Sequence, residues 1–278
     1  MLVVEVNDLR IVENNNVDGF LIGTKKISSE VYYQFTKEEV LAFIEKAHIK
    51  KKLVFLDATN IFHDEDFKEV KEIIDYLSSV DYVMYNDLMI LNIVPKEKRM
   101  YYSTTYITNT LDFDIVAEEN KYVLVSPELS LEELKAFKNK ESSFLIGFGT
   151  WEIFHSRRNL LSNYFQYRKM EYSNSKYHII EEFRKEMYPI VENNGTKIYL
   201  NGYYYLGQEL EELNNNLLLK TFDLDYALVN KIIDAYKNAL ISQDYEELER
   251  MIKDLPLDTN KGLLFEQSIL TKGVKERG

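Results

Sequence analysis

The amino-acid sequence predicts an α/β protein whose core is a (β/α)8 TIM-like barrel. In residues 1–150, short apolar runs alternate with longer stretches whose apolar residues recur at helical spacing, which is typical of repeated strand–helix units and a parallel sheet. Seven such runs precede residue 150, and an eighth follows a tyrosine-rich interruption. The length of 278 residues also suits a single barrel, since barrels commonly reach about 250 residues.

The eight predicted strands are apolar runs of the length expected for buried parallel strands. They cover residues 2–6, 19–23, 53–57, 82–85, 100–103, 122–126, 144–148 and 217–222. Helices are predicted at 37–47, 64–79, from Ser130 onward, at 226–241 and at 245–252, with capping-box spacing at Thr36 and Ser130. The first unit is degenerate, because only about a dozen residues separate its strands and residues 13–16 are turn-like.

The interruption between the seventh and eighth strands predicts a separate β-rich insertion. Residues 151–215 are rich in tyrosine and contain short alternating runs at 177–183 and 196–200, which favour antiparallel strands. The predicted organisation is therefore a barrel formed by residues 1–150 and 216–268, an inserted subdomain at 151–215, and a frayed charged tail at 269–278.

Composition excludes several classes of function. The chain has no cysteine, which excludes disulfides, cysteine nucleophiles, thiolate metal sites and cysteine-ligated iron–sulfur clusters within it. The first residues contain acids and no basic lead, and no apolar stretch approaches the ~20 residues that span a bilayer, so a cytoplasmic protein without membrane contact is expected. The net charge of −12 argues against a self-sufficient nucleic-acid binder.

Polar residues follow most of the predicted strands. In a barrel of this kind, reactive and binding groups lie just beyond the carboxyl ends of the strands. The strand-end residues predicted to bind a polar substrate are Thr59, Asn60, Asn86, Asp87, Ser103, Thr105, Asn109 and Glu128. The same residue types also favour helix caps and turns for backbone reasons alone, so a structural role stays open for each.

Common catalytic motifs are missing. The four histidines, His48, His63, His155 and His178, lack the spacing of a metal site, so no metal is predicted. No GxSxG elbow, phosphate-binding loop or dinucleotide-binding turn is present. The glutamate pairs at 181–182, 211–212 and 246–247 are interpreted as solvated faces.

The chain is acidic overall but contains one cluster of basic residues. Arg157, Arg158 and Arg168 lie in a stretch that also contains Asn163 and several aromatic residues. Arginine beside aromatic side chains suits RNA phosphates and unstacked bases, and it equally suits a protein interface. These four residues are therefore predicted to contact RNA or a partner protein, with slight preference for the partner.

The ordered segments resemble the collagenase-like peptidase family, peptidases of unknown catalytic type. The segments that carry the likeness are Asn86-Asp87-Leu88, residues 103–109, residues 123–134 around Ser126-Pro127-Glu128, Gly149, residues 156–164 and residues 261–265. The likeness covers nearly the whole chain. Pro127 and Thr105 stand where the family has arginine and glutamine, and an acid expected before Gly149 is absent.

The resemblance implies a role in oxygen-independent hydroxylation. Family members with a redox role carry four cysteines after the seventh strand, proposed to hold a 4Fe-4S cluster, whereas this chain has none. A short, cysteine-free member is similar to the smaller subunit of a tRNA uridine hydroxylation pair, which implies a cysteine-bearing paralogue as partner, tRNA reached through the complex, and prephenate as the source of the hydroxyl group.

Three hypotheses follow. The chain is the cluster-less subunit of a prephenate-dependent complex that hydroxylates the wobble uridine of tRNA at position 5. Alternatively, it is a collagenase-like peptidase, although peptide hydrolysis needs a nucleophile with a base or a metal-bound water. The third possibility is a barrel that serves as a non-catalytic binding module.

Overall fold

Eight parallel strands close into a barrel in the computed structural model, which describes residues 1–29, 35–103, 107, 109–173, 176–182, 185–192 and 195–266. The strands are β1 (Leu2–Glu5), β2 (Gly19–Gly23), β3 (Leu53–Ala58), β4 (Tyr82–Tyr85), β5 (Arg99–Tyr102), β6 (Tyr122–Leu124), β7 (Ser143–Gly149) and β13 (Asn216–Leu219). Neighbours pair in chain order, and β13 closes the ring by pairing with both β1 and β7. The predicted (β/α)8 fold is confirmed.

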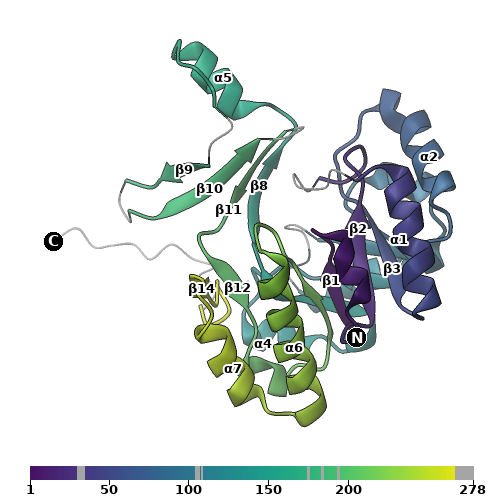
Figure 1. The fold of residues 1–278 in the computed structure, drawn as a ribbon, viewed down its shortest axis with the longest axis vertical. Coiled ribbons are helices and arrows are strands. Elements are labelled where there is room, and N and C mark those ends of the chain that lie inside the picture. Colours follow the sequence, from purple (N-terminus) through teal and green to yellow (C-terminus); the bar gives the residue numbers. More distant parts are fainter. Residues whose placement is uncertain are drawn as a thin grey trace.

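Helices cover the outside of this barrel (Figure 1). They are α1 (Lys37–Ile49), α2 (Phe67–Tyr76), α3 (Thr110–Glu118), α4 (Leu131–Ala136), α6 (Tyr226–Ser242) and α7 (Tyr245–Lys253). Short 3-10 helices are η1 (Leu9–Glu13), η2 (Asp64–Asp66), η3 (Leu88–Asn92), η4 (Lys96–Lys98), η5 (Lys140–Ser142) and η6 (Gln208–Glu211). The first unit is degenerate as predicted, since η1 replaces an α-helix between β1 and β2. Both predicted capping boxes form, at the starts of α1 and α4.

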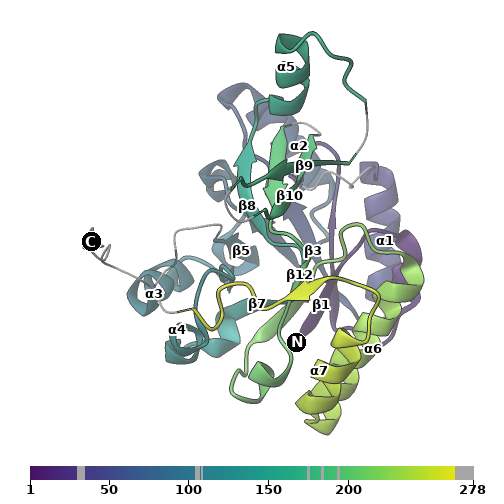
Figure 2. The same cartoon turned by 90° about the vertical axis from the view of Figure 1, so that its left-hand side faces the viewer.

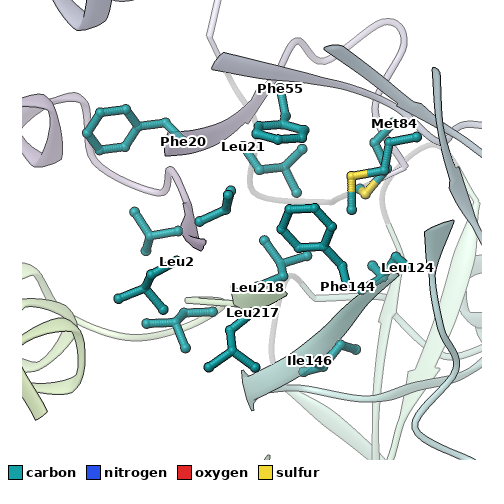
Figure 3. Close-up of a cluster of buried hydrophobic side chains, with 14 of the residues drawn as sticks. Leu2, Phe20, Leu21, Phe55, Met84, Leu124, Phe144, Ile146, Leu217 and Leu218 are labelled. Carbon is teal, nitrogen blue, oxygen red and sulfur yellow. The ribbon is translucent and has the colours of Figure 1, made fainter. Parts of the chain in front are cut away.

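Apolar side chains fill the space between the barrel strands (Figure 3). Phe55 of β3 meets Phe144 of β7 edge to face, with ring centroids 5.7 Å apart, and both are fully buried with Leu2 and Leu218. Burying a large apolar side chain contributes about 1.5–3 kcal/mol each, so this cluster is a main source of stability. A packed barrel interior leaves its ends as the places where a ligand binds.

A separate antiparallel sheet lies between β7 and β13 in the chain. It has the order β8 (Glu152–Ser156), β11 (Thr196–Tyr199), β10 (Met187–Glu192) and β9 (Tyr177–Ile180). Figures 1 and 2 show this sheet beyond the ends of the barrel strands, with α5 (Leu160–Tyr167) at its far end. The predicted β-rich insertion between the seventh and eighth strands is therefore present.

Two further strands border the barrel. β12 (Tyr203–Tyr205) runs antiparallel to β7, and β14 (Thr259–Asn260) pairs with β12. The boundaries 151 and 215 of the inserted subdomain stay a prediction, and the tail at 269–278 lies outside the described residues. In the part of the chain that is described, no helix is long and apolar enough to cross a membrane.

Candidate functional site

A buried carboxylate organises the end of β3. Asp57 is fully buried and accepts hydrogen bonds from Ser28 Oγ at 2.9 Å, from the Thr59 backbone N–H at 2.9 Å and from Thr59 Oγ1 at 2.6 Å. Thr59 Oγ1 also lies 2.7 Å from Ser29 Oγ, which joins the loop after β2 to the loop after β3. We call Ser28, Ser29, Asp57 and Thr59 the Asp57 cluster. The predicted site residue Thr59 is thus 1% exposed and hydrogen-bonded within this cluster.

A buried lysine links the inserted sheet to the same cluster. Lys197 of β11 lies with its Nζ 2.6 Å from Glu152 Oε2, and Nζ donates a hydrogen bond to Ser29 Oγ at 3.0 Å. The side chains of Lys197 and Glu152 are only 2% and 5% exposed. Glu152 lies on β8 and Lys197 on the neighbouring strand β11, so this ion pair lies within the inserted sheet and supplies the partner that a buried charge needs. The hydrogen bond from Lys197 to Ser29 is the contact that reaches the loop after β2.

Three other predicted strand-end residues support local backbone. Asp87 accepts from the backbone N–H groups of Phe62 and Met89, both at 2.9 Å, and caps η3. Asn109 is exposed and caps α3. Ser103 is fully buried and accepts from Ile107 N–H at 3.1 Å. These contacts suit structural roles, and a substrate role for the three stays a prediction.

The remaining predicted strand-end residues, Asn86, Glu128 and Thr105, differ in burial or lie outside the described residues. The side-chain oxygen of Asn86, Oδ1, is buried without a hydrogen-bond partner among the described residues. Glu128 is largely exposed, yet partial burial of its carboxyl raises its pKa. Thr105 lies outside the described residues.

A polar cavity brings two separate predictions together. Asn60 from the end of β3 and Arg157 from the end of β8 both line a cavity of about 340 Å³, together with Lys25, Lys26 and Asp66. Arg157 Nη1 lies 3.3 Å from Asp66 Oδ2, and Lys26 Nζ lies 3.0 Å from Glu69 Oε1. The pKa of Asp66 is lowered by a hydrogen bond from the His63 backbone and by the nearby Arg157. The cations of this cavity are thus partly neutralised by its acids.

The other residues of the basic cluster lie on the inserted part of the chain. Arg158 and Asn163 are exposed before and within α5, and Arg168 is exposed directly after it. Figures 1 and 2 place α5 away from the barrel, at the far end of the inserted sheet. Arg158 lies between Arg157 and Asn159, which both line the polar cavity with Asn60, whereas Asn163 on α5 is not brought to the strand-end residues.

A second cavity, which the sequence did not predict, lies between the inserted sheet and the loop after β13. Its volume is about 360 Å³. Its lining includes five aromatic residues, namely Tyr172, Tyr177, Tyr199, Tyr203 and Phe222. We call it the aromatic cavity. Tyr199 stacks on Phe222 with centroids 5.3 Å apart, and Tyr172 stacks on Tyr177 at 5.8 Å.

Polar groups complete the aromatic cavity. Thr150 follows Gly149, which has a φ of +136° and lies so close to Lys220 that an added Cβ would be 2.5 Å from the Cβ of Lys220. Both the backbone conformation and the close approach require glycine at this position. Lys176 forms an ion pair with Asp223 across the cavity rim. Tyrosine is abundant in residues 151–215, a pattern that favours strands and does not by itself indicate a cavity.

Comparison with known families decides the relationship. The model of Peptidase family U32 matches residues 4–241, which is most of the chain. The chain belongs to peptidase family U32. The resemblance drawn from the ordered sequence segments is thereby confirmed.

Two curated proteins are similar in sequence to this U32 chain. The tRNA hydroxylation protein P2 of Bacillus subtilis is 28% identical over 212 residues, covering 70% of this chain and 68% of that protein. An uncharacterized protease of Methanocaldococcus jannaschii is 28% identical over 183 residues, covering 59% of this chain. The match spans 45% of the archaeal protein, so the chain corresponds to less than half of that relative's length.

Solved structures with a similar arrangement are distant in sequence. A dihydrodipicolinate synthase family protein from Coccidioides immitis has a TM-score of 0.44 at 12% identity, covering 90% of this chain and 76% of that chain. N-acetylneuraminate lyase from Mycoplasma synoviae has a TM-score of 0.41 at 10% identity, covering 87% of this chain and 69% of that chain.

This U32 chain does not fit the iron–sulfur cluster that its resemblance implies for redox members. It contains no cysteine, so the thiolate ligands of such a cluster are missing. Among the described residues, no three histidine, aspartate or glutamate side chains gather into a metal site. These residues therefore cannot hold a cysteine-ligated cluster.

Proposed function

We propose that this U32 chain is the cluster-less subunit of a prephenate-dependent complex that hydroxylates the wobble uridine of tRNA at position 5. In this proposal a cysteine-bearing paralogue carries the 4Fe-4S cluster, and the two chains form a cytoplasmic heterodimer. The observation that carries the proposal is the likeness to tRNA hydroxylation protein P2 along 70% of a chain that has no cysteine.

The distribution of charge supports work beside RNA as part of a complex. The chain carries a net charge of −12, which disfavours RNA binding by its whole surface. Arg158 and Arg168 are nevertheless exposed on one side of the inserted sheet, next to the aromatic residues of α5. A local basic surface of this kind suits either the tRNA or the partner that holds it.

Deletion of the gene tests this proposal. We expect 5-hydroxyuridine to disappear from total tRNA, measured by mass spectrometry of nucleosides, and to return when the wild-type gene is restored. Anaerobic purification of the tagged chain is expected to recover a cysteine-bearing paralogue in equal amount. An unchanged level of 5-hydroxyuridine in the deletion strain would contradict the proposal.

The family name keeps peptidase activity as the alternative. In the described part of the chain, the ring of His48 lies 3.0 Å from Asp81 Oδ2, and the ring of His155 lies 3.9 Å from Glu152 Oε1. His48 and His155 thus each face a carboxylate, and a peptidase would also need a nucleophile beside one of them. Cleavage of casein or collagen by homogeneous protein, absent from an Arg157→Ala or Asn60→Ala variant, would favour the peptidase. Absence of both activities would favour a binding module.

A further inference from the structure

We infer that the aromatic cavity receives one unstacked nucleobase of an RNA, whose phosphates follow the basic segment formed by residues 157–173 and Lys176. This inference rests on the proposed function and deepens it, because it gives the RNA a binding place outside the barrel mouth. Three independent features support it: the aromatic walls, a buried hydroxyl without a partner, and the charge around the entrance.

The walls of the cavity match a planar ring. Tyr172 and Tyr177 form one stacked pair with an interplanar angle of 20°, and Tyr199 and Phe222 form another with the same angle. Single-stranded RNA is recognised largely by stacking its bases on such side chains. Burial raises the pKa of Tyr203 to about 12 and also raises that of Tyr172, so these phenols are uncharged at neutral pH. A volume of about 360 Å³ is within the range of small-ligand pockets.

One polar group in the lining has no partner. Thr150 is 7% exposed, and its Oγ1 makes no hydrogen bond among the described residues. A buried hydroxyl without a partner is unfavourable, so its presence in a cavity lining points to a ligand atom that completes it. Thr24 is 4% exposed with the same unpaired Oγ1, but it lies outside both cavities. Asn86 likewise lies outside them.

Charge around the cavity distinguishes its interior from its entrance. The described residues of 157–176 contain five lysines and arginines and one acid, Glu171, against the net charge of −12 for the chain. Arg168, Lys169 and Lys176 in this segment are exposed. The lining itself contains Glu192, whose carboxylate accepts from Leu161 N–H at 2.8 Å. A neutral ring suits the cavity interior, and phosphates suit the basic residues at its entrance. An anionic ligand inside the cavity would instead face Glu192.

A photocrosslinking experiment places the base. The full-length chain, purified together with the partner that accompanies it, is irradiated with a nine-nucleotide single-stranded RNA that carries a central 5-iodouridine. We expect crosslinks on Tyr172 or Tyr177, identified by mass spectrometry of the peptides. Crosslinks confined to peptides outside the aromatic cavity would overturn the inference.

Matched variants test the hydroxyl and the stacking. Thr150→Val is expected to leave the melting temperature unchanged or raised and to weaken binding of the same RNA about five- to tenfold, the effect of one lost hydrogen bond. Thr24→Val removes an equivalent hydroxyl outside the cavity, so its affinity should equal that of the wild type. Tyr172→Ala should weaken binding and Tyr172→Phe should retain it. Equal affinity of Thr150→Val and wild type would refute the role of the hydroxyl.

Modification in cells separates this inference from the proposed function. If the deletion strain lacks 5-hydroxyuridine and the Thr150→Val and Tyr172→Ala genes restore it fully, the proposed function stands and the cavity inference fails. If crosslinks map to the cavity but the deletion strain keeps 5-hydroxyuridine, the RNA site stands and the proposed function fails.

Discussion

The Asp57 cluster, at the end of β3, and the aromatic cavity, beside the loop after β13, differ in the hydrogen bonding of their buried polar groups. Asp57 is fully buried and receives three hydrogen bonds from its own cluster. In the aromatic cavity, Thr150 is also buried, at 7% exposed, yet its hydroxyl has no partner among the described residues. A polar group satisfied by its neighbours holds loops in place, whereas an unsatisfied one beside open space is available to a ligand.

This difference changes where a ligand is expected on the barrel. Strand-end residues are the usual binding positions in such folds. Here Thr59, Asp87 and Asn109 hydrogen-bond their own loops and helix starts. The segment between β7 and β13 supplies four of the five aromatic residues of the cavity and the exposed cations Arg168, Lys169 and Lys176. Binding is therefore expected to depend more on the insertion than on the strand ends.

The largest effect is expected from removing Lys197, which pairs with Glu152 inside the inserted sheet and donates a hydrogen bond to Ser29 of the Asp57 cluster. Lys197→Met leaves the buried carboxylate of Glu152 without its 2.6 Å partner. Removing one partner of a buried ion pair costs about 3–5 kcal/mol, because the other charge stays buried without a partner. The free energy of unfolding, measured by urea denaturation, should fall by that amount. The double variant Lys197→Met, Glu152→Gln should recover part of the loss. A loss below about 1 kcal/mol in the single variant would mean that the carboxylate of Glu152 is stabilised without Lys197.

A smaller loss is expected within the Asp57 cluster. Asp57→Asn keeps the size of the side chain but replaces one acceptor oxygen with an NH2 donor. That donor would face a group that itself donates, because Ser28 Oγ and Thr59 N–H donate to the two oxygens of the native carboxylate. The expected loss of unfolding free energy is about 1–3 kcal/mol. RNA affinity in the folded variant should stay within twofold of wild type. Unchanged stability together with lost tRNA hydroxylation would instead assign Asp57 a direct role in the reaction.

The barrel could be predicted from the sequence because its strands are short apolar runs, most of which are followed directly by polar residues. Predicted and observed strands at 19–23 and 82–85 coincide, and the others differ by up to three residues at an end. Helices α3 and α5 were not predicted. Asp112 and Asp114 interrupt the apolar pattern of α3, and α5 is short and rich in tyrosine, a residue that also favours strands.

The aromatic cavity could not be predicted in the same way. Thr150, Tyr177, Tyr199 and Phe222 lie in four different segments. They come together because β9, β10 and β11 pair with one another and Tyr199 of β11 stacks on Phe222 in the loop after β13. Local pattern likewise cannot distinguish an asparagine that caps a helix from one that binds substrate, because both follow a strand. Asn109 has the same sequence setting in either case, and the structure shows its oxygen accepting from the first turn of α3.

The smallest stability effect and a clear binding effect are expected together at the rim of the aromatic cavity. The ion pair of Lys176 with Asp223 is exposed, with side chains 77% and 47% accessible, so Lys176→Ala should change the unfolding free energy by less than about 1 kcal/mol. If the lysine faces an RNA phosphate, the slope of log affinity against log salt should fall by about 1. Lys68→Ala removes a comparably exposed lysine from α2 and should leave that slope unchanged. Equal slopes for both variants would place the RNA backbone elsewhere on the basic segment and leave Lys176 a purely structural partner of Asp223.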